Sequence, residues 1–401
     1  MNTSGMISFW SSSKDMNLNN INRIHFIGIG GIGMSALARL FLHEGKTVSG
    51  SDAHQTDLTK KLSEEGIEVS YDQSANNIQS KGSDPLLGLV VYTEAMAEDN
   101  PELVAARAEG IKTVNYFEAL GMVANEYYLI AVAGTHGKST TTSMLTDVLE
   151  EAGLDPSAII GSLRSKTGSN YRAGKSKYMI VEACEYRRDF MHLRPDVLVI
   201  TNVELEHVDY YKDLADVQSA FRELAEFVPE DGAVVCDTSD LALQPIVTGL
   251  SCQLIDYRQF VNPFLKLRLP GVHNRLNAAA ATGVADFLKI DQEVVDSALK
   301  NYAGIWRRFE YKGDVNNAPV YDDYSHHPTE VKAAIAGARE LYPEKKITVV
   351  FQSHTYSRTR ELFSDFVSAL SKADRVIMLP IYPARQEDTT GVSAEDLVKS
   401  L

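Results

Sequence analysis

A glycine-containing loop between a buried strand and a helix is the part of this sequence best suited to chemistry on phosphates. The apolar run at residues 128–132 predicts the strand, and the apolar spacing of residues 144–148 predicts the helix. Between them, backbone N–H groups and a helix N-terminus can cradle phosphates. Lys138 is placed to reach the terminal phosphates, and the Ser139 hydroxyl is placed to ligate Mg²⁺. The loop therefore predicts ATP binding.

The same loop is not a complete Walker A motif, because Val132 stands where the first glycine belongs. The shorter form weakens a generic match and indicates a narrower set of ATP-using proteins. The alternative is a structural strand-to-helix turn, which the register of Lys138 and Ser139 argues against. We predict that the nucleotide is contacted by Gly134, Thr135, His136, Gly137, Lys138, Ser139 and Thr140.

An earlier glycine loop also follows an apolar strand, at residues 24–29, and opens a helix; its glycines are Gly28, Gly30, Gly31 and Gly33. Asp52 closes the next strand, about where a Rossmann unit places its ribose-binding acid. Alone, this pattern suggests a nicotinamide dinucleotide, but a simple dehydrogenase does not need the second phosphate loop. A diphosphate-linked sugar nucleotide fits equally well, and a tight turn without a ligand is the structural alternative.

Acidic residues and a histidine follow two later apolar strands. Glu182 and Glu185 come after one strand, and Glu204 and His207 come after the next. In an open parallel sheet, ligands lie outside the carboxyl ends of the strands. Carboxylates and one imidazole beside a nucleotide suit Mg²⁺, and we favour Glu182 and His207 as ligands. For Glu185 and Glu204, solvated loop charge is an equally good interpretation.

Further polar groups lie toward the C-terminal end. Asn274 can bond an adenine edge, whereas Asn277 fits a cap or a packing contact. The basic pairs Arg307-Arg308 and Arg358-x-Arg360 can hold phosphate or carboxylate, or can pair with surface acids. The block from Asp322 to Thr329 places two acids, a tyrosine and two histidines where a strand ends and a helix begins.

The elements that position these residues alternate between strand and helix, which predicts an α/β fold with three consecutive parallel-sheet domains. A chain of 401 residues is long enough for two or three domains. We expect a mobile tail at residues 1–20, a Rossmann-like domain at 21–123, a central P-loop domain at 124–309 and a third α/β domain at 310–401. In the third domain, residues 319–322, 347–351 and 375–379 are expected to be parallel strands, with helices at 329–341 and 359–370.

Composition excludes several classes of protein. A net charge of −15 argues against binding to nucleic acid or to anionic membranes. Three widely spaced cysteines without a C-x-x-C pattern suit a reducing cytosol. No apolar run reaches membrane-spanning length, and the N-terminal segment lacks the apolar stretch of a signal peptide. We expect a cytoplasmic protein without membrane insertion.

In this order, the motifs resemble the Mur ligase family of ATP-dependent amide-bond ligases, over nearly the whole chain from about residue 22. The matching segments are residues 25–35, 49–52, 100–102, 134–140, 273–277, 307–309, 322–330 and 357–360. The double-histidine block together with the Gly-Ile-Gly-Gly loop is typical of the alanine-adding branch and of its tripeptide-recycling relative.

The resemblance implies a UDP-sugar domain, a central ATPase and a Rossmann-like amino-acid domain. It also implies a reaction of peptidoglycan precursor synthesis: ATP phosphorylates the lactyl carboxylate of UDP-N-acetylmuramate, and the amine of L-alanine attacks the acyl phosphate. ATP and Mg²⁺ would be the cofactors, and the protein would act as a monomer or homodimer. The alternatives are the tripeptide-recycling ligase and a homologue that binds nucleotide and UDP-sugar but has lost catalysis.

The resemblance also implies residue roles. Catalysis would depend on Lys138, Glu182, His207 and Arg308, and the metal would be held by Ser139, Glu182 and His207. Asn274 would face adenine, Asp323 the ribose and Arg308 the phosphates. The substrate sites would comprise Gly28, Gly30, Gly31, Gly33, Met34, Ser35 and Asp52 for the UDP-sugar, and Tyr324, His326 and Arg358 for L-alanine.

The sequence departs from the family pattern at several positions. Cys184 stands in place of an Asp, Glu206 replaces the usual Asp before His207, Thr355 stands where Arg is frequent, and Trp306 replaces a Gly. The central domain is trimmed between residues 237 and 271. The chain ends at Leu401, whereas similar family members continue for roughly 50 residues, so we expect a shortened third domain.

Overall fold

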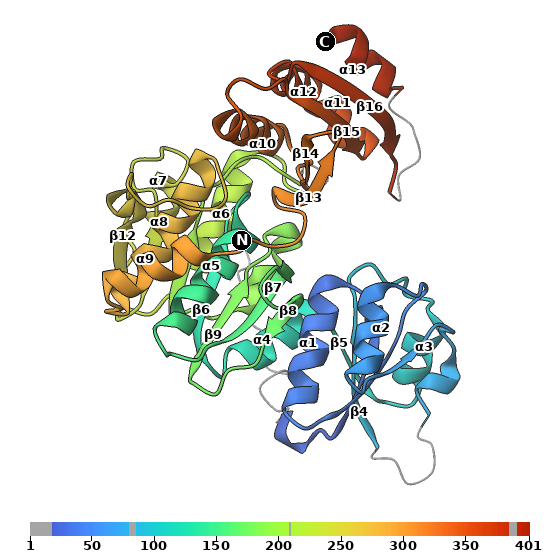
Figure 1. The fold of residues 1–401 in the computed structure, drawn as a ribbon. Coiled ribbons are helices and arrows are strands. Elements are labelled where there is room, and N and C mark those ends of the chain that lie inside the picture. The colour runs from blue at the N-terminus through green and yellow to red at the C-terminus, as the bar shows by residue number, and fades with distance from the viewer. Residues whose placement is uncertain (1–17, 80–85, 208–209, 385–390) are drawn as a thin grey trace, which may run out of the picture.

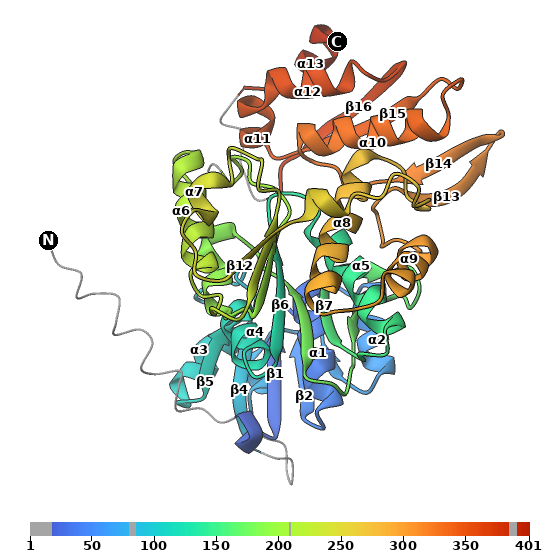
Figure 2. The same ribbon diagram turned by 90° about the vertical axis from the view of Figure 1, so that its left-hand side faces the viewer.

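The computed structural model describes residues 18–79, 86–207, 210–384 and 391–401, which form three α/β parts in chain order (Figure 1). The central part lies between the other two, and Figure 2 shows the third part above it and the first part below it. Of the predicted N-terminal tail, residues 1–17 lie outside the described residues, and Leu18–Asn20 form a short 3-10 turn.

The first part is a five-stranded parallel sheet with the order β3-β2-β1-β4-β5. Its strands are β1 (Arg23–Ile27), β2 (Thr47–Ser51), β3 (Glu68–Ser70), β4 (Leu87–Tyr92) and β5 (Lys112–Asn115), and its helices are α1 (Ile32–His43), α2 (Asp57–Glu64), α3 (Pro101–Ala108) and α4 (Tyr116–Ala124). The strand order reverses between β1 and β4, so the switch point of the sheet lies at the carboxyl ends of these two strands. The first glycine loop leaves β1 at that point.

The central part has a seven-stranded sheet with the order β12-β11-β10-β6-β9-β7-β8. Its strands are β6 (Tyr128–Ala133), β7 (Ser157–Arg164), β8 (Ser169–Arg172), β9 (Tyr178–Glu182), β10 (Val197–Ile200), β11 (Ala233–Cys236) and β12 (Gln253–Asp256). The covering helices are α5 (Lys138–Glu151), α6 (Leu214–Ala225), α7 (Gln244–Val247), α8 (Val272–Phe287) and α9 (Gln292–Asn301), with 3-10 turns η3 (Tyr186–His192) and η4 (Tyr257–Phe260). Strand β6 lies in the middle of the sheet and pairs in parallel with β9 and β10. The phosphate loop therefore opens between two strands whose carboxyl ends carry acidic residues.

The third part holds two separate strand pairs. Its elements are β13 (Glu310–Val315), β14 (Ala318–Asp322), α10 (Pro328–Leu341), β15 (Thr348–His354), α11 (Tyr356–Glu361), α12 (Phe363–Leu370), β16 (Arg375–Tyr382) and α13 (Ala394–Ser400). Strands β15 and β16 are parallel, as predicted. The helix expected at residues 359–370 is divided at Leu362, whose backbone leaves the helical region with φ −104° and ψ 22°.

The prediction of a parallel strand at residues 319–322 is wrong, because β14 pairs antiparallel with β13. The reason is the connection between them. Asn316 and Asn317 both adopt positive φ, 51° and 64°, as in a two-residue hairpin turn. A connection of two residues joins antiparallel strands only, since a parallel pair needs a crossover.

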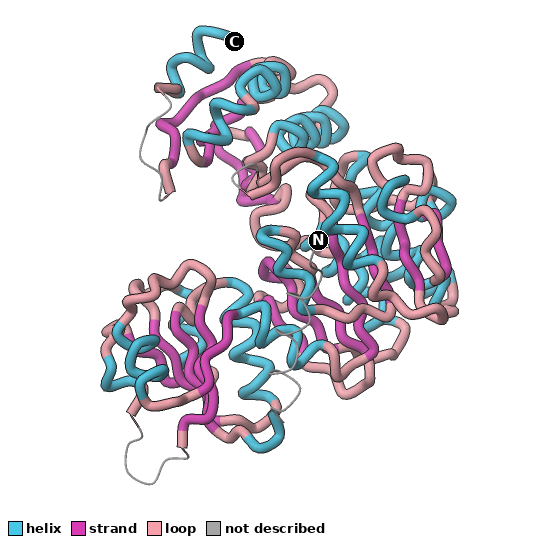
Figure 3. The backbone as a smooth tube through the Cα atoms, turned by 180° about the vertical axis from the view of Figure 1, so that it is seen from behind, coloured by secondary structure: helices cyan, strands magenta, loops and turns pink. Residues whose placement is uncertain are grey.

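The fold class is otherwise confirmed: consecutive α/β parts built on mainly parallel strands. Figure 3 shows the same alternation of helices and strands from behind. One hydrophobic cluster contains buried residues of both the first part and the central part, so these two parts share a core. Among the described residues, we find no helix long and apolar enough to cross a membrane.

Candidate active site

The phosphate loop has a backbone that only glycine accommodates at two positions. Gly134 has φ 129° and Gly137 has φ 87°. A Cβ atom at Gly137 would collide with Oδ1 of Asn277, and one at Gly134 would collide with Oγ1 of Thr201. Helix α5 starts directly after Gly137 without a side-chain cap. The open N–H groups of its first turn and the positive end of its dipole thus form a cradle for an anion.

Lys138 is held in this cradle by a buried carboxylate. Its Nζ lies 2.9 Å from Oε1 of Glu185, and it also donates to the carbonyl of Gly134 at 2.5 Å. Burial opposes the charge on Lys138, but Glu185 outweighs it and the pKa of the amine is raised. The side chain of Glu185 is only 3% exposed. Glu185 is therefore a fixed partner of the lysine and not a solvated loop charge.

Glu182 occupies the neighbouring position at the carboxyl end of β9. Its Oε2 accepts a hydrogen bond from Ser139 Oγ at 2.9 Å, and Oε1 accepts from the backbone N–H of Gly161. Burial raises the pKa of this carboxyl group. Ser139 and Glu182, which the sequence assigned together to a metal, are thus adjacent.

His207 lies in a different group of possible ligands. Atoms of Glu185, Glu206 and His207 all fall within 4.8 Å of one another. Two carboxylates and an imidazole make a donor set that suits a divalent cation. Glu182 is not in this group and bonds to Ser139 instead. The two predicted ligands Glu182 and His207 therefore have different neighbours. The sequence analysis favoured Glu182 over Glu185 and did not select Glu206, although both Glu185 and Glu206 lie close to His207.

His136 forms a charged bridge between the phosphate loop and helix α10. Its ring nitrogens lie 3.6 Å from Oε2 of Glu204 and 3.4 Å from Oε1 of Glu330. Burial would lower the pKa of His136, but the two carboxylates raise it to about 9. An imidazolium cannot ligate a metal, so the proximity of His136, Glu204 and His327 is better explained as an ion-pair network. In His327, Nδ1 accepts from the N–H of Thr329 at 3.3 Å and caps helix α10.

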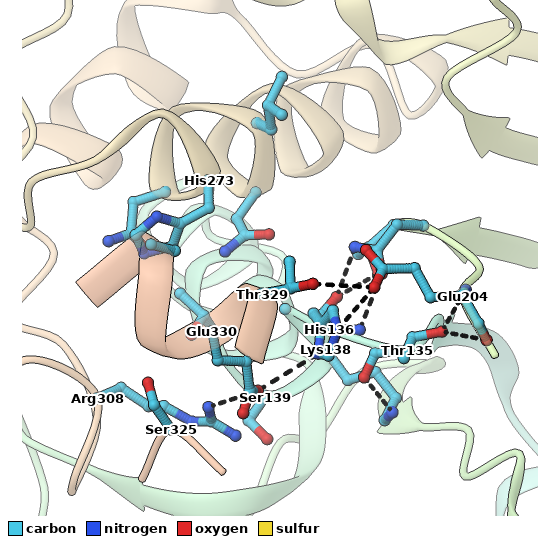
Figure 4. Close-up of a pocket in the computed structure, with 18 of the residues that line it drawn as sticks. Thr135, His136, Lys138, Ser139, Glu204, His273, Arg308, Ser325, Thr329 and Glu330 are labelled. Atoms are coloured by element: carbon cyan, nitrogen blue, oxygen red, sulfur yellow. Dashed lines mark hydrogen bonds and ion pairs between the residues drawn. The ribbon is translucent and has the colours of Figure 1, made fainter. Parts of the chain in front are cut away.

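A cavity of about 470 Å³ joins the phosphate loop to the third part. Figure 4 shows His273 and Arg308 on one side of it and the loop residues on the other. All predicted nucleotide residues except Gly134 line it: Asn274, Arg308, Asp323 and all of Thr135–Thr140. Asn274 donates to the carbonyl of Pro270 at 2.7 Å, which leaves its amide oxygen available. Asp323 is fixed by the N–H of Phe309 at 2.7 Å.

The residues predicted to hold the amino acid either line this cavity or contact residues that line it. His326 lines it, and both His326 and Arg358 approach Oε1 of Glu206, at 3.7 Å and 3.2 Å. Tyr324 is 48% exposed, with the guanidinium of Arg308 5.7 Å from its ring centre. Tyr324 and Arg358 thus lie next to residues of the cavity wall, and His326 and Arg358 both face the carboxylate of Glu206.

The first glycine loop is shaped by its own neighbours. Asp52 accepts from the N–H of Gly30 at 2.8 Å, so it braces the loop. A Cβ atom at Gly28 would lie 2.6 Å from a methyl group of Thr93, and Gly28 has φ 83°. Met34 and Ser35 are buried, and Ser35 Oγ accepts from Asn170 at 2.9 Å across the contact between the first two parts. Their positions favour packing, and substrate contact by Gly28, Gly30, Gly31, Gly33, Met34, Ser35 and Asp52 stays a prediction.

Sequence models of one family match all three parts of the chain. The matches are the Mur ligase family catalytic domain at residues 23–128, the Mur ligase middle domain at 132–257 and the Mur ligase glutamate ligase domain at 307–401. The chain belongs to the Mur ligase family, whose members are ATP-dependent enzymes that form amide bonds.

Individual relatives narrow this class. The chain is 43% identical to the UDP-N-acetylmuramate–L-alanine ligase of Agathobacter rectalis, over 94% of this chain and 87% of the relative. It is 39% identical to the ligase of the same name from Clostridium tetani, over 96% and 89%. Among solved structures, the UDP-N-acetylmuramate–alanine ligase of Thermotoga maritima superimposes with a TM-score of 0.77 at 30% identity, covering 94% of this chain and 87% of that one. A tripeptide-adding ligase from Neisseria meningitides reaches 0.65 at 28% identity, covering 72% of this chain and 100% of that one.

Proposed function

We propose that this protein joins L-alanine to the lactyl carboxylate of UDP-N-acetylmuramate, with conversion of ATP to ADP and phosphate, in cytoplasmic peptidoglycan precursor synthesis. The observation that supports it most directly is one cavity lined by three segments: the phosphate loop, the loop after β10 that carries Glu204, Glu206 and His207, and the N-terminus of α10. A phosphoryl-transfer site and an amine-binding site must adjoin in a ligase that makes an acyl phosphate. The named relatives favour L-alanine as the amine.

ATP fits the residues of the cavity. The glycine cradle of residues 134–140 would hold the phosphates, with Arg308 beside them, Asn274 at adenine and Asp323 at the ribose. The amine of Lys138 is already fixed and charged by Glu185, so it can offset charge on the transferring phosphoryl group without reorganising.

Mg²⁺ fits the donor set beside the loop. Ser139, Glu182 and His207 are the proposed ligands, and Glu185 and Glu206 stand close enough to contribute. A bound divalent ion would neutralise phosphate charge and orient the phosphoryl group. Ser139 and the carboxylates of Glu182 and Glu185 supply hard oxygen donors beside the first residues of α5, which is what this ion prefers.

The remaining steps need positioning more than covalent chemistry. The lactyl carboxylate attacks the γ-phosphorus and ADP leaves. The neutral amine of L-alanine then attacks the acyl phosphate, and phosphate leaves as the amide forms. We assign the alanine carboxylate to Arg358 and His326, with Tyr324 beside them, because the guanidinium of Arg358 and the ring of His326 both face a carboxylate in the structure, that of Glu206. The UDP-sugar is assigned to the first glycine loop.

The test is an ADP-release assay with UDP-N-acetylmuramate and a panel of acceptors: L-alanine, glycine, L-serine and the murein tripeptide. We expect the highest kcat/KM with L-alanine. Preference for the tripeptide would instead establish a recycling ligase. Nucleotide binding without ADP release from any acceptor would establish a homologue that binds ATP but does not catalyse ligation.

A further inference from the structure

Glu330 is a buried acidic residue to which the proposed reaction assigns no role. It lies in the first turn of α10, and its side chain is 11% exposed. Oε1 lies 3.2 Å from Nη1 of Arg308 and 3.4 Å from Nδ1 of His136. Oε2 accepts from the backbone N–H of His326 at 3.1 Å and lies 3.4 Å from its ring Nδ1. Figure 4 shows Glu330 between Arg308 and His136.

These contacts join the start of α10 to two segments that are distant from it in the chain. His136 belongs to the phosphate loop, Arg308 to the segment before β13, and His326 to the segment before α10. Each segment contributes a group to a different part of the cavity. A single carboxylate therefore fixes the relative positions of the nucleotide loop, Arg308, which is assigned to the phosphates, and His326, which is assigned to the alanine carboxylate.

The charges explain why the residue at this position is an acid. Glu330 faces two cations, Arg308 and the imidazolium of His136, and caps the positive end of a helix. Burial works against its charge, but His136, His326 and Arg308 hold the pKa of Glu330 well below its usual range. A glutamine at position 330 would place its N–H₂ group, which only donates, against one of the donors that now face Glu330. It would also leave a buried cation without a partner.

We propose that Glu330 is a positioning residue that couples occupancy of the phosphate loop to the amine-binding site, holding Arg308 and the start of α10 in register with His136. This inference rests on the proposed ligase function. It extends that function by naming the side chain that links the ATP site at the phosphate loop to the site assigned to L-alanine.

The competing explanation is that Glu330 only helps to dock the third part on the central part. Glu340 offers a matched control for it, because it lies on the same helix α10 and its carboxylate also reaches the central part. It lies 2.8 Å from Nη1 of Arg275 and accepts from the N–H of Gly271 at 3.2 Å. Glu340 is 45% exposed and does not line the cavity. The Glu340→Gln variant thus loses a docking contact without changing any residue that lines the cavity.

The experiment compares the full chain with its Glu330→Gln and Glu340→Gln variants. For Glu330→Gln we expect kcat for ADP release to fall about 100-fold, the size of effect caused by misplacing a group near the reacting atoms by about 1 Å. The dissociation constant for ATP, titrated without acceptor, should change less than about threefold, because Asn202 and Thr201 still hold the backbone of the phosphate loop at His136. Glu340→Gln should keep both values near those of the unchanged chain.

Hydrogen exchange supplies a readout that does not depend on turnover. ATP should slow amide exchange at the start of α10, around residues 328–333, in the unchanged chain and in Glu340→Gln but not in Glu330→Gln. Equal behaviour of the two variants in kcat and in exchange would overturn the inference, as would parallel loss of ATP binding and thermal stability in Glu330→Gln alone. If the unchanged chain binds ATP but releases no ADP with any acceptor, the proposed function fails, and exchange still decides the role of Glu330.

Discussion

Replacing Lys138 with Met should damage stability and catalysis for separable reasons. The amine of Lys138 lies 2.9 Å from Oε1 of Glu185, whose side chain is 3% exposed. Removing one partner of a buried ion pair costs about 3–5 kcal/mol. We expect about 3 kcal/mol, the lower end of that range, because Lys138 is 18% exposed and His207 lies 3.8 Å from Glu185 as a substitute partner.

The Lys138→Met/Glu185→Gln double variant separates the two effects. It removes the stranded carboxylate, so most of the lost free energy of unfolding should return, since replacing both partners of a buried pair is nearly neutral. Activity should not return, because the charge that faces the phosphates is absent from both variants. We expect kcat to fall about 10²–10³-fold in each, the effect of removing one preorganised group at a developing charge.

Urea unfolding followed by tryptophan fluorescence measures the first effect, and ADP release measures the second. The single variant should unfold at a lower urea concentration than either the unchanged chain or the double variant. Equal unfolding midpoints for the single and double variants would refute the idea that the buried carboxylate of Glu185 destabilises the fold when Lys138 is absent. Recovery of kcat in the double variant would refute a direct role of the lysine at the phosphates.

Three further predictions follow from individual contacts. Gly137→Ala should weaken ATP binding at least about tenfold in a calorimetric titration, because the φ of 87° at Gly137 and the neighbouring Asn277 exclude a Cβ atom. The control is Gly153→Ala, where φ is 73° and the space around the glycine is open. It should leave the dissociation constant for ATP unchanged in the same titration. Burial, aided by Glu94, raises the pKa of Asp189 to about 7, so the folded state binds its proton more tightly than the unfolded state. Its contribution to stability is therefore full at acidic pH and is lost as the pH rises toward 7, and Asp189→Asn should raise the urea midpoint more at pH 8 than at pH 5; an equal gain at both would contradict this. Removal of divalent ions with EDTA should abolish ADP release, and added Mg²⁺ should restore it; turnover that persists in EDTA would exclude a metal from the reaction.

Most of the architecture could be predicted because it depends on local patterns. The apolar strand before Gly134 and the helix that starts at Lys138 are set by neighbouring residues, and so is the turn at Gly28. In the third part, β15 and β16 are parallel as predicted, whereas β14 was expected to be parallel and pairs antiparallel with β13, because pairing depends on the connection. The two asparagines at 316 and 317 carried that signal.

The candidate site was predictable in outline but not in its ion pairs. Strand ends placed Glu182 and Glu185 near the phosphate loop, yet only the packed structure shows that Glu185 holds Lys138 and Glu182 holds Ser139. Glu330 was not predicted as a site residue, because its contacts to Arg308 and His136 come from two segments that are distant in the chain. Its position three residues after His327, as the acid of a capping box, was the available signal.

The central claim is that amide formation proceeds through an acyl phosphate on the lactyl carboxylate. It is tested most directly with UDP-N-acetylmuramate labelled with ¹⁸O in that carboxylate, in the presence of ATP, Mg²⁺ and L-alanine. Because one carboxylate oxygen becomes the bridge to phosphorus and leaves with it, we predict one ¹⁸O in the released phosphate for each amide formed. Amide formation that yields unlabelled phosphate would contradict the account.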